Sequence, residues 1–322
     1  MPSRHLVDPQ ILPMVEQAPF VVLDDGRLAE SRAAMDAMMP PPGPPPVDLK
    51  VYTEHVPGLD GAPEVRVAIT APAAHGAGRP GILHIHGGGF IMGAAEMTSA
   101  FDAAYAREFG AVCVSVDYRL APETPHPGPV NDCYAALKWL YENASGLGVD
   151  PHNIAVTGAS AGGGLAAALV LLARDRAEVP VAFQHLIYPM LDDRTGTRPD
   201  PSPYLGQFIW TPDSNRFGWR ALIGGEPGGA DVSPYAAPAR AQDLAGLPPT
   251  FIACGALDLF AEEDLEYARR LILAGVPTEL HIYPGGPHGF NAVPDAEITK
   301  ALDRDSMGAL KRALTKPSEK GG

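Results

Sequence analysis

The segment 154–176 constrains the fold more than any other part of this chain. An apolar run, Ile154-Ala155-Val156-Thr157, leads into Gly158-Ala159-Ser160-Ala161-Gly162-Gly163, and the helix-forming run 165–174 follows. Small residues on both sides of Ser160 allow a sharp turn that pushes the serine hydroxyl out at the end of a strand. Amides at the start of the following helix point to the same place, which suits an oxyanion. The alternative is a glycine-rich helix start that binds a phosphate or nothing, since Gly-Ser-Gly turns are common.

A second glycine-rich turn lies upstream, where the apolar run 80–86 leads directly into Gly87-Gly88-Gly89-Phe90. A serine acyl-transfer enzyme needs N–H donors that already surround the oxygen of its tetrahedral intermediate. Glycines bring such donors close to a substrate because they have no Cβ atom. We interpret His86 as an organiser that holds this loop through its ring nitrogens. Three glycines alone would indicate a flexible loop, but His-Gly-Gly-Gly ahead of G-x-S-x-G is the oxyanion-loop arrangement of lipases and esterases.

A nucleophilic serine also needs a base and an orienting acid, in the chain order Ser, Asp or Glu, His for this type of sheet. Of the ten histidines, His288 is the best placed, because it lies in the loop after the predicted strand 278–283. Catalytic groups concentrate on loops at the carboxyl ends of parallel strands. His281 alternates with apolar neighbours, so we expect it on a face of that strand.

Asp258 is the favoured orienting acid. It follows the predicted strand 250–255, with room for one helix and one strand before His288. Its rivals are Asp192 and Asp193, which follow another apolar run. Three nearby carboxylates are interpreted as the acidic first turn of the next helix, which the helix dipole favours: Glu262, Glu263 and Asp264.

Together these segments resemble the hormone-sensitive lipase family of α/β-hydrolases, which contains many bacterial carboxylesterases. The similarity spans residues 50–315, in the order of the family. The matching segments are His86-Gly87-Gly88-Gly89-Phe90, Asp117-Tyr118-Arg119-Leu120-Ala121-Pro122-Glu123, Gly158-Ala159-Ser160-Ala161-Gly162-Gly163, Gly255-Ala256-Leu257-Asp258-Leu259 and His288-Gly289-Phe290. The chain departs from the family at Ala159, where many members have Asp or Thr. That difference bears on the subfamily and on substrate preference, not on the chemistry.

The resemblance implies a catalytic triad and an oxyanion hole. The nucleophile would be Ser160, the general base and acid His288, and the orienting carboxylate Asp258. The N–H donors of the oxyanion hole would come from three residues: Gly88, Gly89 and Ala161. This chemistry requires no metal and no organic cofactor.

The chain contains eight candidate strands, which are residues 49–56, 64–71, 81–86, 111–117, 153–158, 181–188, 250–255 and 278–283. Helical stretches are expected at 99–109, 129–144, 161–176, 262–274 and 295–314. Strands that alternate with helices predict a mostly parallel sheet, whereas the first strands lack intervening helices and should pair antiparallel at one edge. With the resemblance, the expected fold is an α/β-hydrolase: a mostly parallel eight-stranded sheet flanked by helices, with a helical cap.

Two segments fall outside this core, and we interpret both as parts of the cap. Residues 1–48 contain the proline-rich run 40–46, which is interpreted as a stiff connector rather than an SH3-type ligand. Residues 191–240 could instead be an ordinary helix that packs its aromatic side chains into the core. Those side chains are Tyr204, Phe208, Trp210, Phe217 and Trp219. The catalytic domain would then consist of 49–190 and 241–322.

Composition excludes several classes of function. A hydrophobic content of 46 % excludes global disorder, and a formal charge of −14 argues against nucleic acid or an anionic membrane surface as a partner. Three scattered cysteines, Cys113, Cys133 and Cys254, form no disulfide or metal-ligand pattern and are expected to be buried small hydrophobic residues. The segment 1–20 lacks the apolar run of a signal peptide, and no run approaches the ~18 apolar residues of a transmembrane helix. We therefore expect a cytoplasmic protein.

The sequence predicts a serine carboxylesterase that hydrolyses small to medium, fairly apolar esters with short acyl chains through an acyl-enzyme on Ser160. One alternative is another serine acyl hydrolase, such as an amidase, deacetylase, lactonase or peptidase. A second is a non-catalytic receptor, because plant gibberellin receptors share the fold. Such receptors have lost the base, whereas this chain keeps Ser160, Asp258 and His288 together. The expected partner is a small-molecule ester, and a homodimer through an edge strand or a terminal helix is possible.

Overall fold

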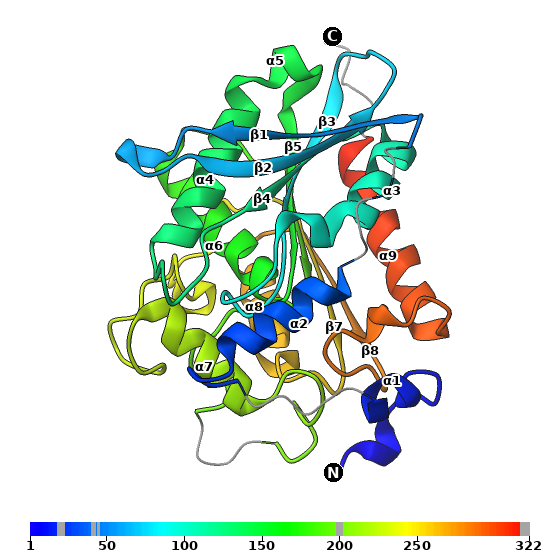
Figure 1. The fold of residues 1–322 in the computed structure, drawn as a ribbon, viewed down its shortest axis with the longest axis vertical. Coiled ribbons are helices and arrows are strands. Elements are labelled where there is room, and N and C mark those ends of the chain that lie inside the picture. The colour runs from blue at the N-terminus through cyan, green and yellow to red at the C-terminus, as the bar shows by residue number, and fades with distance from the viewer. Residues whose placement is uncertain (18–22, 40–42, 44–45, 198–201, 316–322) are drawn as a thin grey trace.

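In the computed structural model of the protein, the described residues are 1–17, 23–39, 43, 46–197 and 202–315. Within them, eight strands form one sheet in the order β1-β2-β4-β3-β5-β6-β7-β8 (Figure 1). The strands are β1 (Leu49–Val56), β2 (Val65–Pro72), β3 (Arg79–Ile85), β4 (Val112–Asp117), β5 (Val149–Ala159), β6 (Phe183–Ile187), β7 (Thr250–Gly255) and β8 (Thr278–Tyr283).

Strand directions agree with the sequence prediction. β1 pairs antiparallel with β2, and β2 pairs antiparallel with β4, whereas every pairing from β4 to β8 is parallel. The carboxyl ends of the parallel strands therefore lie at one edge of the sheet, which is where sites form in such folds. The predicted fold class, a mostly parallel eight-stranded sheet of the α/β-hydrolase type, is confirmed.

Helices cover both faces of this sheet. The helices α4 (Gly128–Glu142), α6 (Ala161–Arg176) and α8 (Ala261–Leu273) pack on one face, and α3 (Ser99–Phe109) and α9 (Glu297–Leu314) pack on the other. All five were predicted to within two residues, and the short helix α5 (Ala144–Leu147) follows α4. None of the helices in the described part of the chain is long and apolar enough to cross a membrane.

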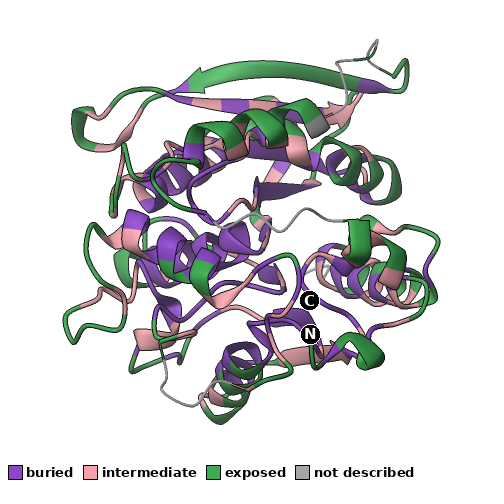
Figure 2. Cartoon of the chain, turned by 60° about the horizontal axis from the view of Figure 1, so that its bottom comes forward, coloured by how far each residue is buried: buried purple, intermediate pink, exposed green. Residues whose placement is uncertain are grey.

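The centre of the sheet is buried, and its outer edge is not (Figure 2). Every residue of β7 is buried, whereas β1 is exposed along all but its two ends. Helix α6 is buried around its whole circumference from Ala161 to Ala173, as expected for a helix enclosed between the sheet and other helices. Because α6 begins directly after Ser160, this packing fixes the position of the serine.

The two segments assigned to a cap lie at the carboxyl edge of the sheet (Figure 1). They contain α1 (Leu12–Gln17), α2 (Leu28–Met38) and α7 (Pro212–Ile223). The segments touch, because Arg220 of α7 forms an ion pair with Asp25. Most of the proline run 40–46 lies outside the described residues. The proposed division into cap and catalytic domain stays a prediction.

Candidate active site

Ser160 occupies a strained turn between β5 and α6. Its backbone has φ 57° and ψ −125°, a conformation that residues other than glycine rarely adopt. The turn is tight, since the backbone leaves no room for a side chain at Gly158: a Cβ atom there would lie 2.2 Å from the Gly162 carbonyl oxygen. A Cβ atom on Gly162 would lie 2.1 Å from the carbonyl oxygen of Ile85. The glycines of the motif are therefore needed for the backbone to approach itself and β3 this closely.

His288 and Asp258 come from the loops that follow β8 and β7, and both reach the serine. The Nε2 atom of His288 lies 3.0 Å from Ser160 Oγ, and its Nδ1 atom lies 2.8 Å from Asp258 Oδ2. An ionised carboxylate only accepts hydrogen bonds, so Nδ1–H donates to Asp258 and Nε2 accepts from the serine hydroxyl. The Phe260 amide donates to the other oxygen of Asp258 at 3.0 Å. All three side chains are buried, which strengthens these interactions.

Aromatic rings surround the imidazole of His288. The ring of Tyr188 meets it edge to face at 4.7 Å, Phe260 is perpendicular to it at 5.2 Å, and the Trp210 indole lies at 6.4 Å. These contacts limit rotation of the imidazole and shield it from water. Neither Tyr188 nor Phe260 is among the residues predicted for the site. Their positions in the sequence could have indicated this role, since Tyr188 directly follows β6 and Phe260 stands two residues after Asp258.

The glycine loop after β3 lies beside the serine. A Cβ atom on Gly87 would lie 3.4 Å from Ser160 Cβ, and Gly88 and Gly89 have φ of 109° and 61°. Among the described residues, the amides of Gly88 and Gly89 donate no backbone hydrogen bond. Ala161 is the first residue of α6, so its amide has no acceptor within the helix. All three amides are therefore available to a ligand, and their role in an oxyanion hole stays a prediction.

His86 is positioned as the predicted loop organiser would be. Its Nδ1 atom lies 2.7 Å from the Gly87 carbonyl oxygen, and its ring stacks on Tyr118 at 4.2 Å. The Tyr118 hydroxyl donates to the His86 carbonyl at 3.1 Å. Burial lowers the pKa of His86 to about 4, so the ring is neutral at pH 7 and its Nδ1–H donates to the loop.

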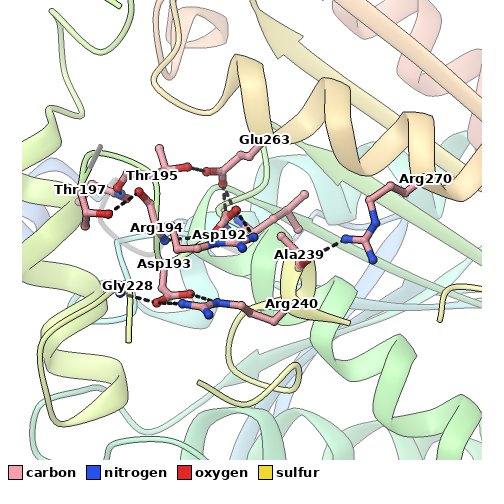
Figure 3. Close-up of polar contacts among 12 residues, drawn as sticks. Asp192, Asp193, Arg194, Thr195, Thr197, Gly228, Ala239, Arg240, Glu263 and Arg270 are labelled. Carbon is pink, nitrogen blue, oxygen red and sulfur yellow. Dashed lines mark hydrogen bonds and ion pairs between the residues drawn. The ribbon is translucent and has the colours of Figure 1, made fainter. Parts of the chain in front are cut away.

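The rival acids, Asp192 and Asp193, are held by arginines instead (Figure 3). Asp192 accepts two hydrogen bonds from the Arg194 guanidinium, at 2.7 and 2.8 Å. Asp193 accepts two from Arg240, at 2.7 and 2.8 Å, and one from the Gly228 amide at 2.7 Å. Neither carboxylate is a hydrogen-bond partner of His288 in the described part of the chain. Their contacts shape the loop after β6, and the geometry favours Asp258 as the acid.

The acidic start of α8 has a second role that the sequence analysis did not anticipate. Glu263 is in the first turn, as expected, but it is buried and accepts hydrogen bonds from the amides of Leu191 and Asp192 at 2.6 and 3.3 Å. It also accepts from the Thr195 hydroxyl (Figure 3). Burial raises the pKa of Glu263 well above its usual range. This side chain therefore ties α8 to the loop after β6 rather than only complementing the helix dipole.

His281 is on β8, with Nε2 2.8 Å from a Glu279 oxygen, as expected for a residue on a strand face. The cysteines are buried and unpaired, also as expected: Cys113, Cys133 and Cys254.

Arg32 of α2 anchors the N-terminal segment to the glycine loop, a contact that no sequence pattern indicated. Its Nε atom donates to the Ile91 carbonyl at 2.7 Å, directly after the loop. Its guanidinium also donates to the Ala121 carbonyl at 3.0 Å and pairs with both oxygens of Glu123 at 2.7 Å. Because Glu123 is largely exposed, the carbonyl contacts matter more than the ion pair. The arginine therefore joins α2 to the backbone that positions Gly88 and Gly89.

Comparisons with known proteins agree with this geometry. Residues 82–292 match the profile of a family described as having the alpha/beta hydrolase fold. The carboxylesterase NlhH of Mycobacterium tuberculosis is 35 % identical over 97 % of this chain and 98 % of its own. The esterase LipI of the same organism is 35 % identical over 94 % of each chain. A solved bacterial heroin esterase has 40 % identity and a TM-score of 0.90, and the match covers 97 % of this chain and 99 % of that one.

The family profile matches well over half of the chain, and the relatives match it along nearly its whole length. The glycine loop, the serine turn and the residues Asp258 and His288 occur along the chain in the order of the matching segments. The chain belongs to the hormone-sensitive lipase family of α/β-hydrolases.

Proposed function

We propose that this protein is a carboxylesterase that hydrolyses short-chain, fairly apolar esters through an acyl-enzyme on Ser160. The observation that carries the proposal is the chain of two hydrogen bonds from Ser160 Oγ through His288 to Asp258, at 3.0 and 2.8 Å. The relatives with the names carboxylesterase and esterase support the same activity.

The first half-reaction begins when His288 Nε2 takes the hydroxyl proton of Ser160 as the oxygen attacks the ester carbonyl. Asp258 keeps the proton on Nδ1 and stabilises the imidazolium. The carbonyl oxygen becomes an oxyanion, which accepts hydrogen bonds from three amides: Gly88, Gly89 and Ala161. Each such donor contributes roughly 10²-fold to the rate. The imidazolium then gives its proton to the departing alcohol, and the acyl group stays on the serine.

Water completes the reaction by the same route. His288 takes a proton from the water as it attacks the acyl-enzyme, and the second oxyanion forms in the same place. Its collapse breaks the bond between the acyl group and Ser160 Oγ and returns the proton from His288 to the serine. The products are a carboxylic acid and an alcohol, and the atoms balance without a further reactant.

The preference for short acyl chains rests on how far the site is enclosed. Ser160 and His288 are 8 % and 7 % exposed, and Trp210 from the segment 191–240 lies near His288. Helix α2 is held beside the glycine loop by Arg32. Both segments act as a cap, and an enclosed site of this kind favours acyl chains of roughly two to eight carbons.

A panel of p-nitrophenyl esters from two to sixteen carbons, with the matching anilides, tests this function. We expect kcat/KM to rise with chain length while the pocket fills and then to fall, because each methylene that fits contributes about 0.8 kcal/mol or less. Faster cleavage of anilides than of esters would identify an amidase instead. An activity that still climbs at sixteen carbons and increases at a lipid interface would identify a lipase. Stoichiometric binding of the panel without turnover would identify a receptor.

A further inference from the structure

A second cavity lies behind the serine turn, on the sheet face covered by α3 and α9. We call it the α3–α9 cavity. Its volume is about 390 Å³, within the range of small-molecule sites. Neither Ser160 nor His288 lines it, although Gly158 and Ala159 of the serine motif do, as does Tyr188, whose ring contacts His288. The cavity is therefore next to the candidate active site but separate from the reacting groups.

The sheet beneath this cavity carries a row of polar side chains at one level. Four strands contribute neighbouring residues in register, in the order Ser115, His84, Thr157 and His185. Two of these, His84 and Thr157, line the cavity, as does Ser306 of α9. Such residues are unusual on the buried face of a central strand, where apolar side chains prevail. None of them has a part in the proposed mechanism.

His84 presents one ring nitrogen to the cavity. Its Nδ1 atom lies 2.7 Å from Asp102 Oδ1, and Asp102 Oδ2 lies 2.8 and 2.6 Å from the hydroxyls of Thr98 and Ser115. A carboxylate only accepts hydrogen bonds, so the His84 proton is on Nδ1. No hydrogen bond to His84 Nε2 is found among the described residues. In the neutral ring, this nitrogen is an acceptor without a donor.

The strand next to His84, together with α9, offers a hydroxyl donor. His185 Nδ1 lies 2.8 Å from Thr157 Oγ1, and its Nε2 lies 2.8 Å from Ser306 Oγ. Burial lowers the pKa of His185 to about 3, so the ring is neutral, with one N–H and one acceptor nitrogen. Whichever tautomer is present, one of the two hydroxyls receives the N–H and keeps its own proton. That proton is available to a ligand.

Most of the walls of the cavity are apolar. The apolar side chains come from α3, α9 and the end of β6, and are Ala100, Phe101, Ala104, Tyr105, Ile187, Leu302 and Met307. Tyr188 and Asn291 also line the cavity, and the Tyr188 hydroxyl donates to Asn291 Oδ1 at 2.7 Å. Phe101 and Ala104 are exposed, so these walls reach the surface. Asp303 also lines the cavity and is exposed. Its carboxylate repels an anionic ligand.

We propose that the α3–α9 cavity binds a small neutral alcohol or phenol, whose hydroxyl donates to His84 Nε2 and accepts from the free hydroxyl of Thr157 or Ser306. A hydroxyl group matches the site because it is both donor and acceptor, whereas an ether only accepts. The apolar part of the ligand packs against Phe101 and Tyr105. An apolar cavity of about 150 Å³ already holds benzene, so this larger one has room for two fused rings.

Calorimetry with 2-naphthol and the full chain at pH 7 tests the proposal. We expect one 2-naphthol per chain. The methyl ether, 2-methoxynaphthalene, should bind about fivefold more weakly or worse, because it leaves His84 Nε2 without a donor. Naphthalene-2-carboxylate should bind more weakly still, because of Asp303. No binding of 2-naphthol, or equal or tighter binding of the ether or the carboxylate, would overturn the proposal.

A variant that fills the cavity locates the bound molecule. Ala104→Trp changes an exposed helical position, so we expect it to fold and to weaken 2-naphthol binding at least tenfold. Glu108→Trp, an exposed position on the same helix outside the lining, is the matched control and should bind as the parent does. Loss of binding in both variants, or in neither, would contradict the assigned location. His84→Phe should also bind at least fivefold more weakly, and Ala104→Trp decides the matter if that variant does not fold.

Binding to protein whose Ser160 carries a diethyl phosphoryl group separates this cavity from the candidate active site. We expect the affinity for 2-naphthol to stay within twofold. Loss of binding would mean that the ligand occupies the catalytic pocket, and would overturn the proposal. If Ser160 does not react with the organophosphate, the proposed esterase function fails, while the comparison of Ala104→Trp with Glu108→Trp still tests the cavity.

Discussion

The indole of Trp210 lies against the backbone of Gly89: a Cβ atom on Gly89 would come within 2.3 Å of Trp210 Cη2. The indole N–H donates to Asn215 Oδ1 at 3.1 Å, which fixes the ring relative to α7. The same ring lies 6.4 Å from His288. One side chain therefore contacts the glycine loop and approaches the base, so its size bears on which acyl chains fit.

Trp210→Phe should shift the preferred acyl chain to a longer one by about two carbons, because a smaller ring leaves more room beside Gly89. We expect kcat/KM for the acetyl ester to fall several-fold and that for the octanoyl ester to rise. The p-nitrophenyl ester series measures both. Trp139→Phe, on α4, is the control and should leave the profile unchanged. The same profile in both variants would show that Trp210 does not border the acyl site.

The two loop glycines should respond differently to alanine. In Gly88→Ala the new Cβ would lie 2.1 Å from the Met92 carbonyl oxygen, and φ is 109°, so both folding stability and activity should be lost. In Gly89→Ala the atoms nearest to the new Cβ belong to the Trp210 side chain rather than to backbone, and the φ of 61° is in the left-handed region, which costs alanine less than the φ of Gly88. There we expect a stable protein whose kcat is roughly 10²-fold lower, the effect of one displaced oxyanion donor.

Combining Gly89→Ala with Trp210→Phe should recover part of that loss, because the smaller ring relieves the contact. Thermal unfolding and kcat, measured on the single and double variants, give the coupling between the two positions. If the losses of kcat in the two single variants simply add in the double variant, the contact between residue 89 and the Trp210 ring is not the cause of the lower activity.

Ser160→Ala, His288→Gln and Asp258→Asn should each lower kcat by about 10³-fold or more, and double variants should add little, because the three act as a unit. Asp192→Asn should instead leave kcat within a few-fold and lower the melting temperature, because Asp192 holds Arg194 rather than His288. An almost silent Asp258→Asn together with a severe Asp192→Asn would mean that the acid has been misidentified.

Arg32→Ala should lower kcat/KM by about tenfold with little change in melting temperature, because it releases α2 from the carbonyls of Ile91 and Ala121. Arg27→Ala, at the exposed start of the same helix, is the matched control. If the two variants have the same kinetics, α2 does not help to position the glycine loop.

Two buried histidines should make the protein less stable in acid. The pKa is lowered by burial to about 4 for His86 and to about 3 for His185, whereas an unfolded histidine titrates near pH 6.5. Between these values the unfolded state binds more protons, so the free energy of unfolding falls as the pH falls from 6.5 to 4. Each histidine contributes up to about 1.4 kcal/mol per pH unit.

Urea unfolding at pH 7 and pH 5 measures this dependence. His185→Gln should reduce the slope by about 1 kcal/mol per pH unit, whereas His152→Gln, at an exposed position, should not. Glu263, with its raised pKa, acts in the opposite direction, but it is present in both proteins and cancels in the difference. An unchanged slope in His185→Gln would show that His185 is protonated in the folded state.

Local pattern predicted most of the secondary structure. The strands 49–56, 250–255 and 278–283 have the predicted bounds, because each is a compact run between turn residues. β5 is longer than predicted and begins at Val149, since Arg79 pairs with Val149 across an irregularity in the ladder. The intervening Asp150, Pro151 and His152 carry no strand signal. The position of β4 between β2 and β3 also depends on pairing partners that no single segment encodes.

Some residues of the candidate site could be predicted from local sequence patterns, and others could not. Ser160, Asp258 and His288 each follow a recognisable strand, so their meeting at one edge follows from a parallel sheet. Trp210 and Arg32 reach the site from segments without strand pattern, and their contacts depend on how those segments fold back. The row of polar side chains beneath α3 and α9 could not be predicted from the sequence either, because its members are far apart along the chain and become neighbours only when the strands pair.

The order in which the chain is synthesised bears on when the loop that carries His288 can meet the rest of the site. The Asp8 amide donates to the Gly285 carbonyl at 3.0 Å, and Ile11 is buried in the same cluster as Phe290. Asp8 and Ile11 are therefore synthesised long before the residues that they contact. Ser160 likewise emerges 128 residues before its base. A nascent chain carries an unassisted serine, and hydrolysis becomes possible only after β8 and the loop behind it have been translated.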